Sequence, residues 1–147
     1  MQAGKLPLEQ LSRILRNISN SDPRVSLGPA PGEDAALIDM GEKYLVAKTD
    51  PITFATSRIG WYAVQVNAND IAVMGGTPKW MMATVLLPEK TSEAEVDSIF
   101  AQMNDACRAI GITLIGGHTE VTYDPVSYTH LRAHETRHDL VCRLLLE

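Results

Sequence analysis

The sequence is poor in cysteine, in basic residues and in long apolar runs, and each shortage excludes a class of protein. Two cysteines in 147 residues cannot form the disulfide framework of a small secreted domain. No apolar stretch is long enough for a signal sequence or a membrane span, so we expect a cytoplasmic protein without a membrane partner. The 13 basic residues are outnumbered by 18 acidic ones, giving a net charge of −5. Because phosphate contacts need clustered lysine and arginine, we expect no nucleic-acid partner.

Residues 126–147 resemble a translated short-read sequencing adapter. The run V-S-Y-T-H-L-R-A-H-E-T is what a transposase adapter encodes in one reading frame, and L-V-C-R-L-L-L matches the adapter sequence that follows an index. We therefore expect a natural domain over residues 1–124 and a non-native tail over residues 125–147, disordered or arbitrarily placed. The alternative is a genuine C-terminal helix between Leu131 and Leu146.

Excluding this tail removes a tempting metal motif. His130, His134 and His138 repeat every four residues, but all three belong to the adapter-like segment, and we reject them as ligands. The tail contains three basic and three acidic residues, so the charge of −5 belongs to the first 124 residues. Cys107 is then the single cysteine of the domain and is expected to be a small core residue.

Hydrophobic spacing predicts one domain of alternating helices and strands. Helices are expected at residues 7–18, 59–74 and 92–110, where apolar residues recur every three to four positions. Strands are expected at residues 35–39, 44–49, 79–87 and 112–115, with a loop at residues 20–32. Ser92 and Glu95 have the spacing of a capping box at the start of the third helix. The fold class is therefore α/β (α+β).

The most informative segment is N-A-N-D-I-A-V-M-G-G-T-P at residues 67–78. It places the amides of Asn67 and Asn69 and the carboxylate of Asp70 within one turn of a largely apolar helix. Two glycines and a proline then end that helix. A buried carboxylate is costly unless it is paired, hydrogen-bonded or bound to metal. We therefore expect a partner for Asp70.

Other polar side chains lie at the expected strand ends, namely Glu33, Asp34, Asp50, His118 and Glu120. Strand ends can converge in a sheet, and several oxygen ligands suit Mg²⁺, which completes its shell with water and phosphate oxygens. A Gly-Gly turn after a strand, here residues 116–117, exposes N–H groups that can meet a phosphate. No Walker lysine loop and no G-x-G-x-x-G is present. Taken singly, each of these strand-end motifs is more typical of a solvated turn or a strand edge than of a functional site.

The order of the motifs is more specific than any one of them. G-E-D-A-A, T-D, N-x-N-D-x-A-x-M-G-G-x-P and G-G-x-T resemble the AIR synthase-related (PurM-like) superfamily over residues 6–124. The superfamily includes aminoimidazole ribonucleotide synthetase, thiamine-monophosphate kinase, selenophosphate synthetase and the HypE protein of hydrogenase maturation. The resemblance implies a PurM N-terminal-like domain: a small mixed sheet with helices on one face, which dimerises through the sheet. It also implies ATP with Mg²⁺ near that interface, and activation of a substrate oxygen by phosphoryl transfer.

The resemblance also implies roles for individual residues. The carboxylates of Glu33, Asp34, Asp50 and Asp70 look like the magnesium side of the site. His118 replaces a carboxylate of the family pattern, and Glu120 is expected to compensate. The nucleotide side is expected at Asn67, Asn69, Gly116, Gly117, His118 and Thr119.

Two segments favour one branch of the superfamily. D-P-I-T-F-A-T at residues 50–56, together with G-G-H-T-E-V-T at residues 116–122, looks most like HypE-related proteins. Thiamine-monophosphate kinases usually carry E-G-x-H-F after the T-D and an acidic residue after the Gly-Gly. We expect the N-terminal half of a homodimeric ATP-dependent enzyme, inactive without its C-terminal domain, whose parent acts on a small-molecule or protein-terminus acceptor. The alternatives are a thiamine-monophosphate-kinase-like kinase, a non-catalytic nucleotide-binding dimeric paralogue, and an acidic α/β domain that binds no nucleotide.

Overall fold

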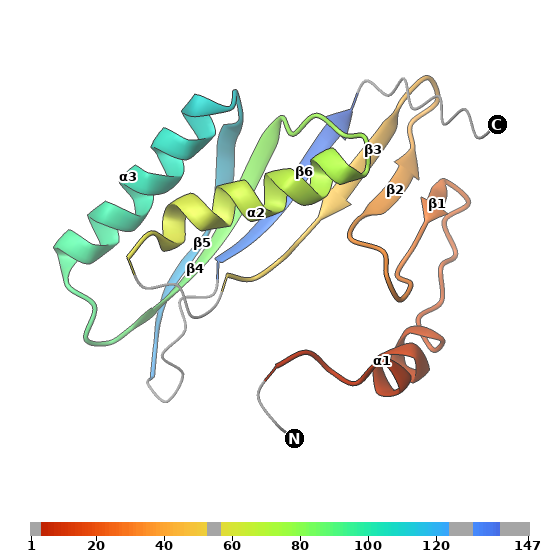
Figure 1. The fold of residues 1–147 in the computed structure, drawn as a ribbon, viewed down its shortest axis with the longest axis horizontal. Helices are drawn as coiled ribbons and strands as arrows, with labels where there is room; N and C mark the ends of the chain where they lie inside the picture. Colours follow the sequence, from red (N-terminus) through yellow and green to blue (C-terminus); the bar gives the residue numbers. More distant parts are fainter. Residues whose placement is uncertain (1–3, 53–56, 124–130, 139–147) are drawn as a thin grey trace.

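The computed structural model describes residues 4–52 and 57–123, and the backbone of residues 131–138. Figure 1 follows the chain through three helices and six strands in these ranges. Their bounds are α1 Leu8–Leu15, β1 Val25–Leu27, β2 Ala36–Asp39, β3 Tyr44–Lys48, α2 Ile59–Val73, β4 Trp80–Pro88, α3 Glu93–Ala109, β5 Thr113–Thr122 and β6 Leu131–His138. No helix of the described ranges is long and apolar enough to cross a membrane.

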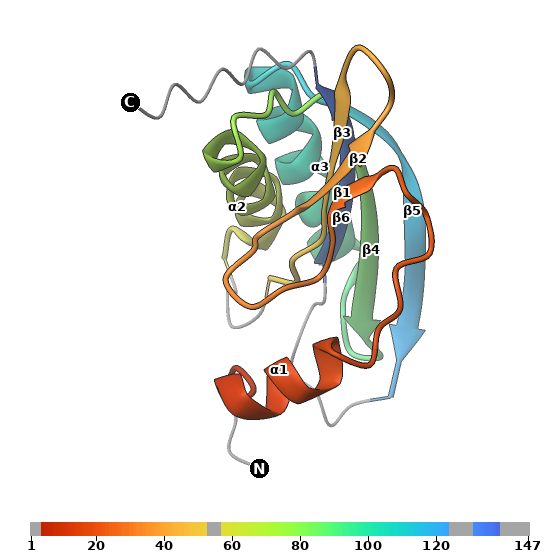
Figure 2. The same ribbon diagram turned by 90° about the vertical axis from the view of Figure 1, so that its right-hand side faces the viewer.

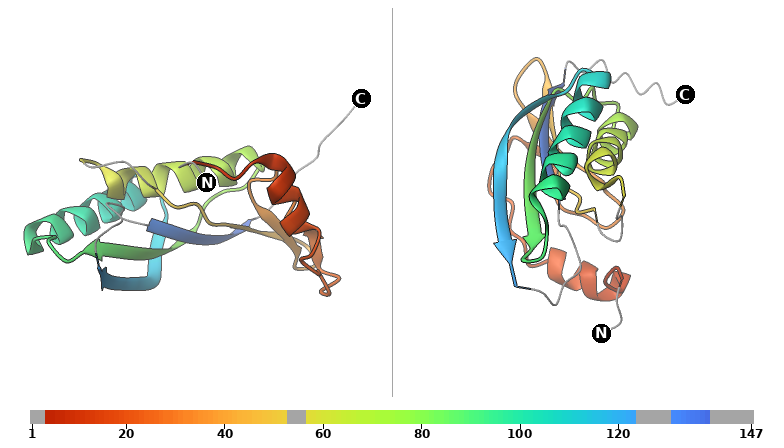
Figure 3. Two further views of the ribbon diagram at one scale, coloured as in Figure 1. Left: turned by 90° about the horizontal axis from the view of Figure 1, so that it is seen from below. Right: turned by 90° about the vertical axis from the view of Figure 1, so that its left-hand side faces the viewer.

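The strands form one mixed sheet in the order β1-β2-β3-β6-β4-β5. β4 and β5 are parallel and are joined through α3, whereas the other neighbouring pairs are antiparallel. Figure 2 shows α2 and α3 side by side on one face of the sheet. Figure 3 shows the same layer from below, with the opposite face of the sheet uncovered by either helix. The expected mixed sheet with its helices on one face is confirmed.

The core fills the space between this helix layer and the sheet. Alternate residues of β4 are buried against the helices, and α2 and α3 contribute the facing apolar side chains. A smaller cluster of Ala35, Val46 and Ile71 joins β2 and β3 to the C-terminal part of α2. Cys107 is 2% exposed and belongs to the larger cluster, as its apolar neighbours predict.

The two covering helices cross closely at Gly60. A Cβ built at this position would lie 2.3 Å from the carbonyl oxygen of Ile99 on α3. The side chain of Gln102 on α3 accepts from the Gly60 N–H at 3.2 Å, so α3 caps the first turn of α2. Gly60 is therefore required by the helix crossing, and its backbone donor is satisfied from the neighbouring helix.

The predicted start of α3 and the predicted end of α2 are confirmed. Ser92 and Glu95 form the reciprocal capping box at the start of α3. The hydrogen bonds that Glu95 accepts, chiefly from the Ser92 backbone, hold the pKa of its carboxyl below the ordinary value. At the end of α2, Gly75 adopts φ 77° and the Gly76 N–H donates to the carbonyl of Ile71 at 2.8 Å.

β5 differs from expectation because it does not stop at Gly116-Gly117. The strand runs on to Thr122, with a bulge at Ile115 where the register against β4 shifts. Gly117 adopts φ 151°, and a Cβ there would lie 1.8 Å from the Ala83 carbonyl oxygen of β4. The expected turn at residues 116–117 is therefore wrong, because β5 continues through both glycines and Gly117 lies close to β4. Their role beside a phosphate stays a prediction.

Two further strands are absent from the sequence prediction. Val25–Leu27, expected as loop, forms β1 against β2. Leu131–His138, part of the tail expected to be disordered or arbitrarily placed, forms β6 between β3 and β4 rather than the alternative helix. Because strand pairing uses backbone groups, two open strand edges can hold an extended segment with little demand on its side chains. His130 and the side chains of His134 and His138 lie outside the described structure, so their exclusion as metal ligands stays a prediction.

Candidate functional site

Lys48 and two of the predicted carboxylates meet at the end of β3. The side chain of Lys48 is 7% exposed, and its Nζ forms an ion pair with Asp70 Oδ2 on α2. The same Nζ lies 3.7 Å from Asp50 Oδ2, just beyond β3. The partner expected for Asp70 is thus a buried lysine.

The local sequence explains how these three groups come together. Alternation along β3 turns Lys48 to the same buried face as Val46, toward the helix layer. Ile71, next to Asp70, packs in the small core cluster with Val46. The core contact between β3 and α2 therefore sets Asp70 beside the end of β3.

Asn67 fixes the backbone of Asp50. Its Oδ1 accepts from the Asp50 N–H at 3.0 Å, and its Nδ2 donates to the Asp50 carbonyl at 3.4 Å and to the Ala63 carbonyl at 2.8 Å. The residue is 0% exposed. The buried amide of Asn67 thus has protein partners at both ends, and its expected contact with a nucleotide stays a prediction. Asn69 is exposed on α2, and its role stays a prediction.

Glu33 and Asp34 lie at the same end of the β2–β3 pair as this cluster. The register sets Ala36 opposite Ala47, so the residues entering β2 face those leaving β3. Both carboxylates are exposed. Within the described residues, neither side chain has an ion pair or a hydrogen bond. The register brings them toward Asp50 without joining them to the ion-pair cluster.

The predicted nucleotide-side residues of β5 line a hollow of their own. Its volume is about 360 Å³, and its walls are Ala83, Phe100, Leu114, Gly116, Gly117, His118 and Thr119. The Nε2 of His118 lies 3.4 Å from Glu120 Oε2, with both side chains largely exposed. Since β5 is an edge strand with β4 on one side only, half of its backbone groups face away from the sheet.

This hollow and the lysine cluster are separate within one chain. β6 and β4 lie between β3 and β5, so three strand spacings, on the order of 14 Å, divide them. Over residues 4–52 and 57–123, no three His, Cys, Asp or Glu side chains lie close enough to hold a metal ion. Of the five predicted metal ligands, only Asp50 and Asp70 meet, and Glu120 lies on the far strand.

Lys48 is the residue that motif reasoning missed. The strand pattern carried a signal, because a lysine two positions after Val46 falls on the buried face of a predicted strand. A buried lysine is almost always paired, so its position already required a nearby carboxylate. The segment 53–56, quoted for its resemblance to HypE-related proteins, lies outside the described residues.

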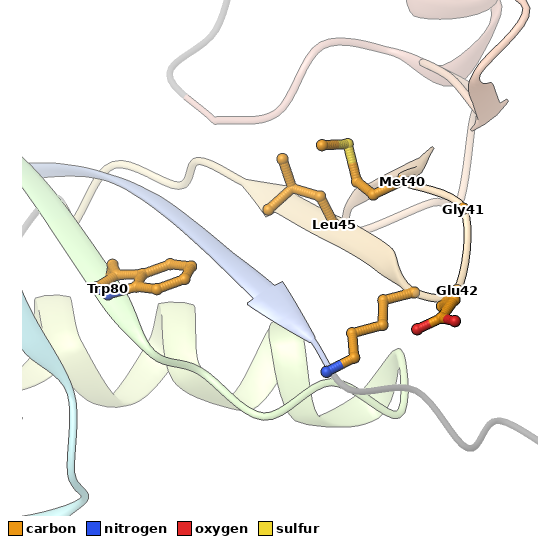
Figure 4. A pocket seen from close by; sticks show the side chains of 6 residues that line it. Met40, Gly41, Glu42, Leu45 and Trp80 are labelled. Atoms are coloured by element: carbon orange, nitrogen blue, oxygen red, sulfur yellow. The ribbon is translucent and has the colours of Figure 1, made fainter.

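A second, more apolar hollow opens on the helix-free side of the sheet. We call this side the open face; on β4 it carries Trp80, Met82, Thr84 and Leu86. The hollow has a volume of about 740 Å³, and Figure 4 shows Met40, Leu45 and Trp80 around it, with the β2–β3 turn at its edge. Trp80 and Met82 are 37% and 40% exposed. Large apolar side chains are therefore accessible on the open face.

The motifs and the fold agree with a known family. Residues 32–131 match the model of the AIR synthase related protein, N-terminal domain. The chain belongs to this family. A hydrogenase expression/formation protein of Methanocaldococcus jannaschii is 28% identical over 127 residues, which is 82% of this chain and 38% of the relative. Thiamine-monophosphate kinase of Escherichia coli is 30% identical over 138 residues, 88% of this chain and 40% of the enzyme.

Solved structures of the family share the fold. Hydrogenase maturation protein HypE, solved in complex with ATP, superposes with a TM-score of 0.63 at 23% identity, over 82% of this chain and 36% of HypE. AaThiL, complexed with AMPPCP and TMP, gives a TM-score of 0.64 at 20% identity, over 86% of this chain and 38% of that protein. The chain thus spans about two fifths of the length of these AIR synthase-related proteins.

Proposed function

We propose that this chain is the Mg-ATP-binding half of an enzyme that activates a substrate oxygen by phosphoryl transfer. The observation that carries the proposal is the convergence of Asp50 and Asp70 on one buried cationic group. Each carboxylate comes from a separate family motif, the T-D and the N-x-N-D. Because carboxylates from two distant motifs approach the same positive charge, the site can hold a cation.

The donor set fits magnesium. Mg²⁺ is commonly held by one or two carboxylates and completes its shell with water and phosphate oxygens. Asp50 and Asp70 supply two carboxylates that are 46% and 23% exposed, so water and a phosphate can reach them. When bound, Mg²⁺ would supply charge neutralisation for the nucleotide phosphates. Asn67, through the backbone of Asp50, would keep one of the two carboxylates in place.

The hollow along β5 is proposed as the nucleotide side. Its glycines leave the backbone accessible, and Thr119 and His118 add polar side chains to the wall. The hollow and the carboxylates lie about three strand spacings apart in one chain. We propose a homodimer formed through the open face, with the nucleotide near that interface. The apolar side chains of the open face support this arrangement.

The HypE branch is the proposed setting, with hydrogenase maturation as the process. The related protein of M. jannaschii covers 82% of this chain, and the HypE structure contains ATP. A thiamine-monophosphate-kinase-like activity is the alternative from the same family. The acceptor, a small molecule or a protein terminus, is proposed from the resemblance alone. We propose a cytoplasmic location, since the buried Cys107 suits a reducing compartment.

A second candidate is a nucleotide-sensing paralogue without turnover. It is favoured by the lysine that already pairs with both Asp50 and Asp70, and by the lack of a third ligand within the described residues. Mg-ATP binding without ATP hydrolysis or transfer by the longer protein, over a broad acceptor panel, would support it. Turnover with any acceptor would exclude it.

The replacement Asp70→Asn tests the main proposal. Loss of one charged contact to the cation is worth about 1.5 to 3 kcal/mol, so we expect Mg-ATP to bind roughly 10- to 100-fold more weakly. Isothermal calorimetry with Mg-ATP measures this change. Circular dichroism should show an unchanged fold, because Asp70 is partly exposed and Lys48 keeps Asp50 as a partner.

Asp97→Asn is the matched control, because it makes the same change at an exposed position on α3. We expect its affinity for Mg-ATP to equal that of the unaltered chain. Equal affinities for all three proteins would contradict the assignment of Asp70, and no binding by any of them would favour the acidic domain without a nucleotide site.

A further inference from the structure

Lys48 is the one residue of the Asp50–Asp70 cluster that the proposed function does not use. Its side chain is more than nine-tenths buried and reaches both carboxylates from the strand beneath them. The neighbouring strand position on the same face, Val46, is 0% exposed. A lysine placed in this way is costly unless its charge is matched. The two carboxylates supply that match.

The charge balance of the cluster has a consequence for any incoming cation. One ammonium against two carboxylates leaves a net charge of about −1 on formal counting, whereas the carboxylates alone would offer −2. A divalent cation between the same oxygens would lie within a few ångströms of the ammonium. Like charges at that separation repel by several kcal/mol at the effective dielectric of a partly buried site. The ammonium and the divalent cation therefore compete for the carboxylates.

We propose that Lys48 is a positioning residue that acts as the resident cation of the Asp50–Asp70 pair. It holds the two carboxylates together in the metal-free protein, and a divalent cation must displace it before binding. The lysine stem is flexible, and its displaced ammonium is then a partner for a nucleotide phosphate. Mg²⁺ alone binds weakly as a result, and Mg²⁺ with nucleotide binds cooperatively. The identity of the cation and of the nucleotide rests on the proposed function.

The test is a titration of the unliganded chain with Mg²⁺ alone, read as a shift in melting temperature. Lys48→Met keeps the apolar stem and removes the charge. We expect this variant to melt at a lower temperature without Mg²⁺, and to be stabilised at an Mg²⁺ concentration at least roughly tenfold lower than the unaltered chain needs. Lys90→Met removes the same charge from an exposed position and should follow the unaltered chain.

A second variant covers the case in which Lys48→Met does not fold. Lys48→Gln retains a hydrogen-bond donor for the carboxylates while removing the charge, and it should show the same shift in Mg²⁺ dependence. An Mg²⁺ midpoint that is equal in the Lys48 variants and the unaltered chain would overturn the proposal. So would the lack of any Mg²⁺ response in all of them.

Mg-ATP binding by the unaltered chain, measured separately by calorimetry, keeps the two proposals apart. If Mg-ATP binds but the Lys48 variants leave the Mg²⁺ midpoint unchanged, the role of Lys48 is wrong and the nucleotide assignment stands. If the Lys48 variants shift the midpoint but the chain does not bind ATP, Lys48 keeps its role as resident cation and the nucleotide assignment fails.

Discussion

At the scale of single residues, the site depends on a buried side chain whose polar atoms have protein partners. The side-chain amide of Asn67 hydrogen-bonds both backbone groups of Asp50. Its Nδ2 also bonds the Ala63 carbonyl, so the amide is anchored within its own helix. The position of a proposed metal carboxylate is thus set by a buried amide on the neighbouring element.

The variant Asn67→Ala should therefore destabilise the domain and loosen Asp50 together. It removes the partners of buried backbone groups, which costs about 1 to 3 kcal/mol. Urea denaturation measures the free energy of unfolding, and Mg-ATP calorimetry on the folded variant should show weaker binding. Asn104→Ala, at an exposed position of α3, serves as control. If Asn67→Ala has the same free energy of unfolding as that control, the hydrogen bonds to Asp50 do not contribute to stability.

The sequence predicted part of this site and left the rest open for a physical reason. The motif around Asp70 correctly required a partner, because a carboxylate in an apolar helix is costly alone. The identity of that partner depended on which strand packs beside α2, and this pairing is a tertiary contact without a local signal. The same limit applies to Asn67. Its residue type suggests a ligand contact, but only the tertiary structure shows that the amide is buried and hydrogen-bonded to Asp50 and Ala63.

At the scale of elements, hydrophobic period and caps predicted the three helices to within a few residues. α2 and α3 were expected at residues 59–74 and 92–110 and lie at Ile59–Val73 and Glu93–Ala109. The strands with a weak local signal were missed or shortened. β1 has three residues, and β5 continues through two glycines because the adjacent β4 supports it. Pairing partners, rather than propensity, determine such strands.

The close crossing of α2 and α3 gives an element-scale prediction. In an isolated helix Gly60→Ala would be favourable by about 1 kcal/mol, but here the added methyl group meets the Ile99 carbonyl of α3. We expect a net loss of about 1 to 3 kcal/mol, because overpacking must force the helices apart. Thermal or urea unfolding measures this loss.

Gly28→Ala is the control for this experiment, because the nearest atoms to a new Cβ there lie at 3.7 and 3.8 Å. Its stability should stay within about 0.5 kcal/mol of the unaltered chain. A Gly60→Ala protein as stable as the Gly28→Ala protein would show that the helix layer can relax without cost.

At the scale of the whole molecule, the two faces of the sheet differ in what covers them. The helices cover one face, and the other carries exposed Trp80 and Met82 beside an apolar hollow. Accessible apolar side chains gathered on one face are typical of an interaction surface. This asymmetry supports the proposed homodimer, in which a second copy would cover the open face.

Replacing Met82 with lysine should break such a dimer. A charge placed in the apolar centre of the interface is costly to bury, whereas the side chain is 40% exposed in the single chain. Sedimentation velocity should therefore show a monomer. Circular dichroism of the same variant should show an unchanged fold. Val73→Lys changes an apolar residue that is 72% exposed on α2 and should leave the dimer intact. A monomeric unaltered chain would contradict the proposed interface.

In this chain of 147 residues, which includes the tail expected to be non-native, the place of β6 sets the order in which the sheet can be completed during synthesis. β1–β3 and β4–β5 are made first, and β6 alone bridges them, through pairs such as Lys48 with Glu135 and Met82 with His134. Until residues 131–138 leave the ribosome, β3 and β4 each keep an unpaired edge. Contacts between residues so distant in sequence form slowly, and open edges can pair with other nascent chains. For the chain that carries this tail, the interval before the last strand is made is therefore when aggregation is most favoured.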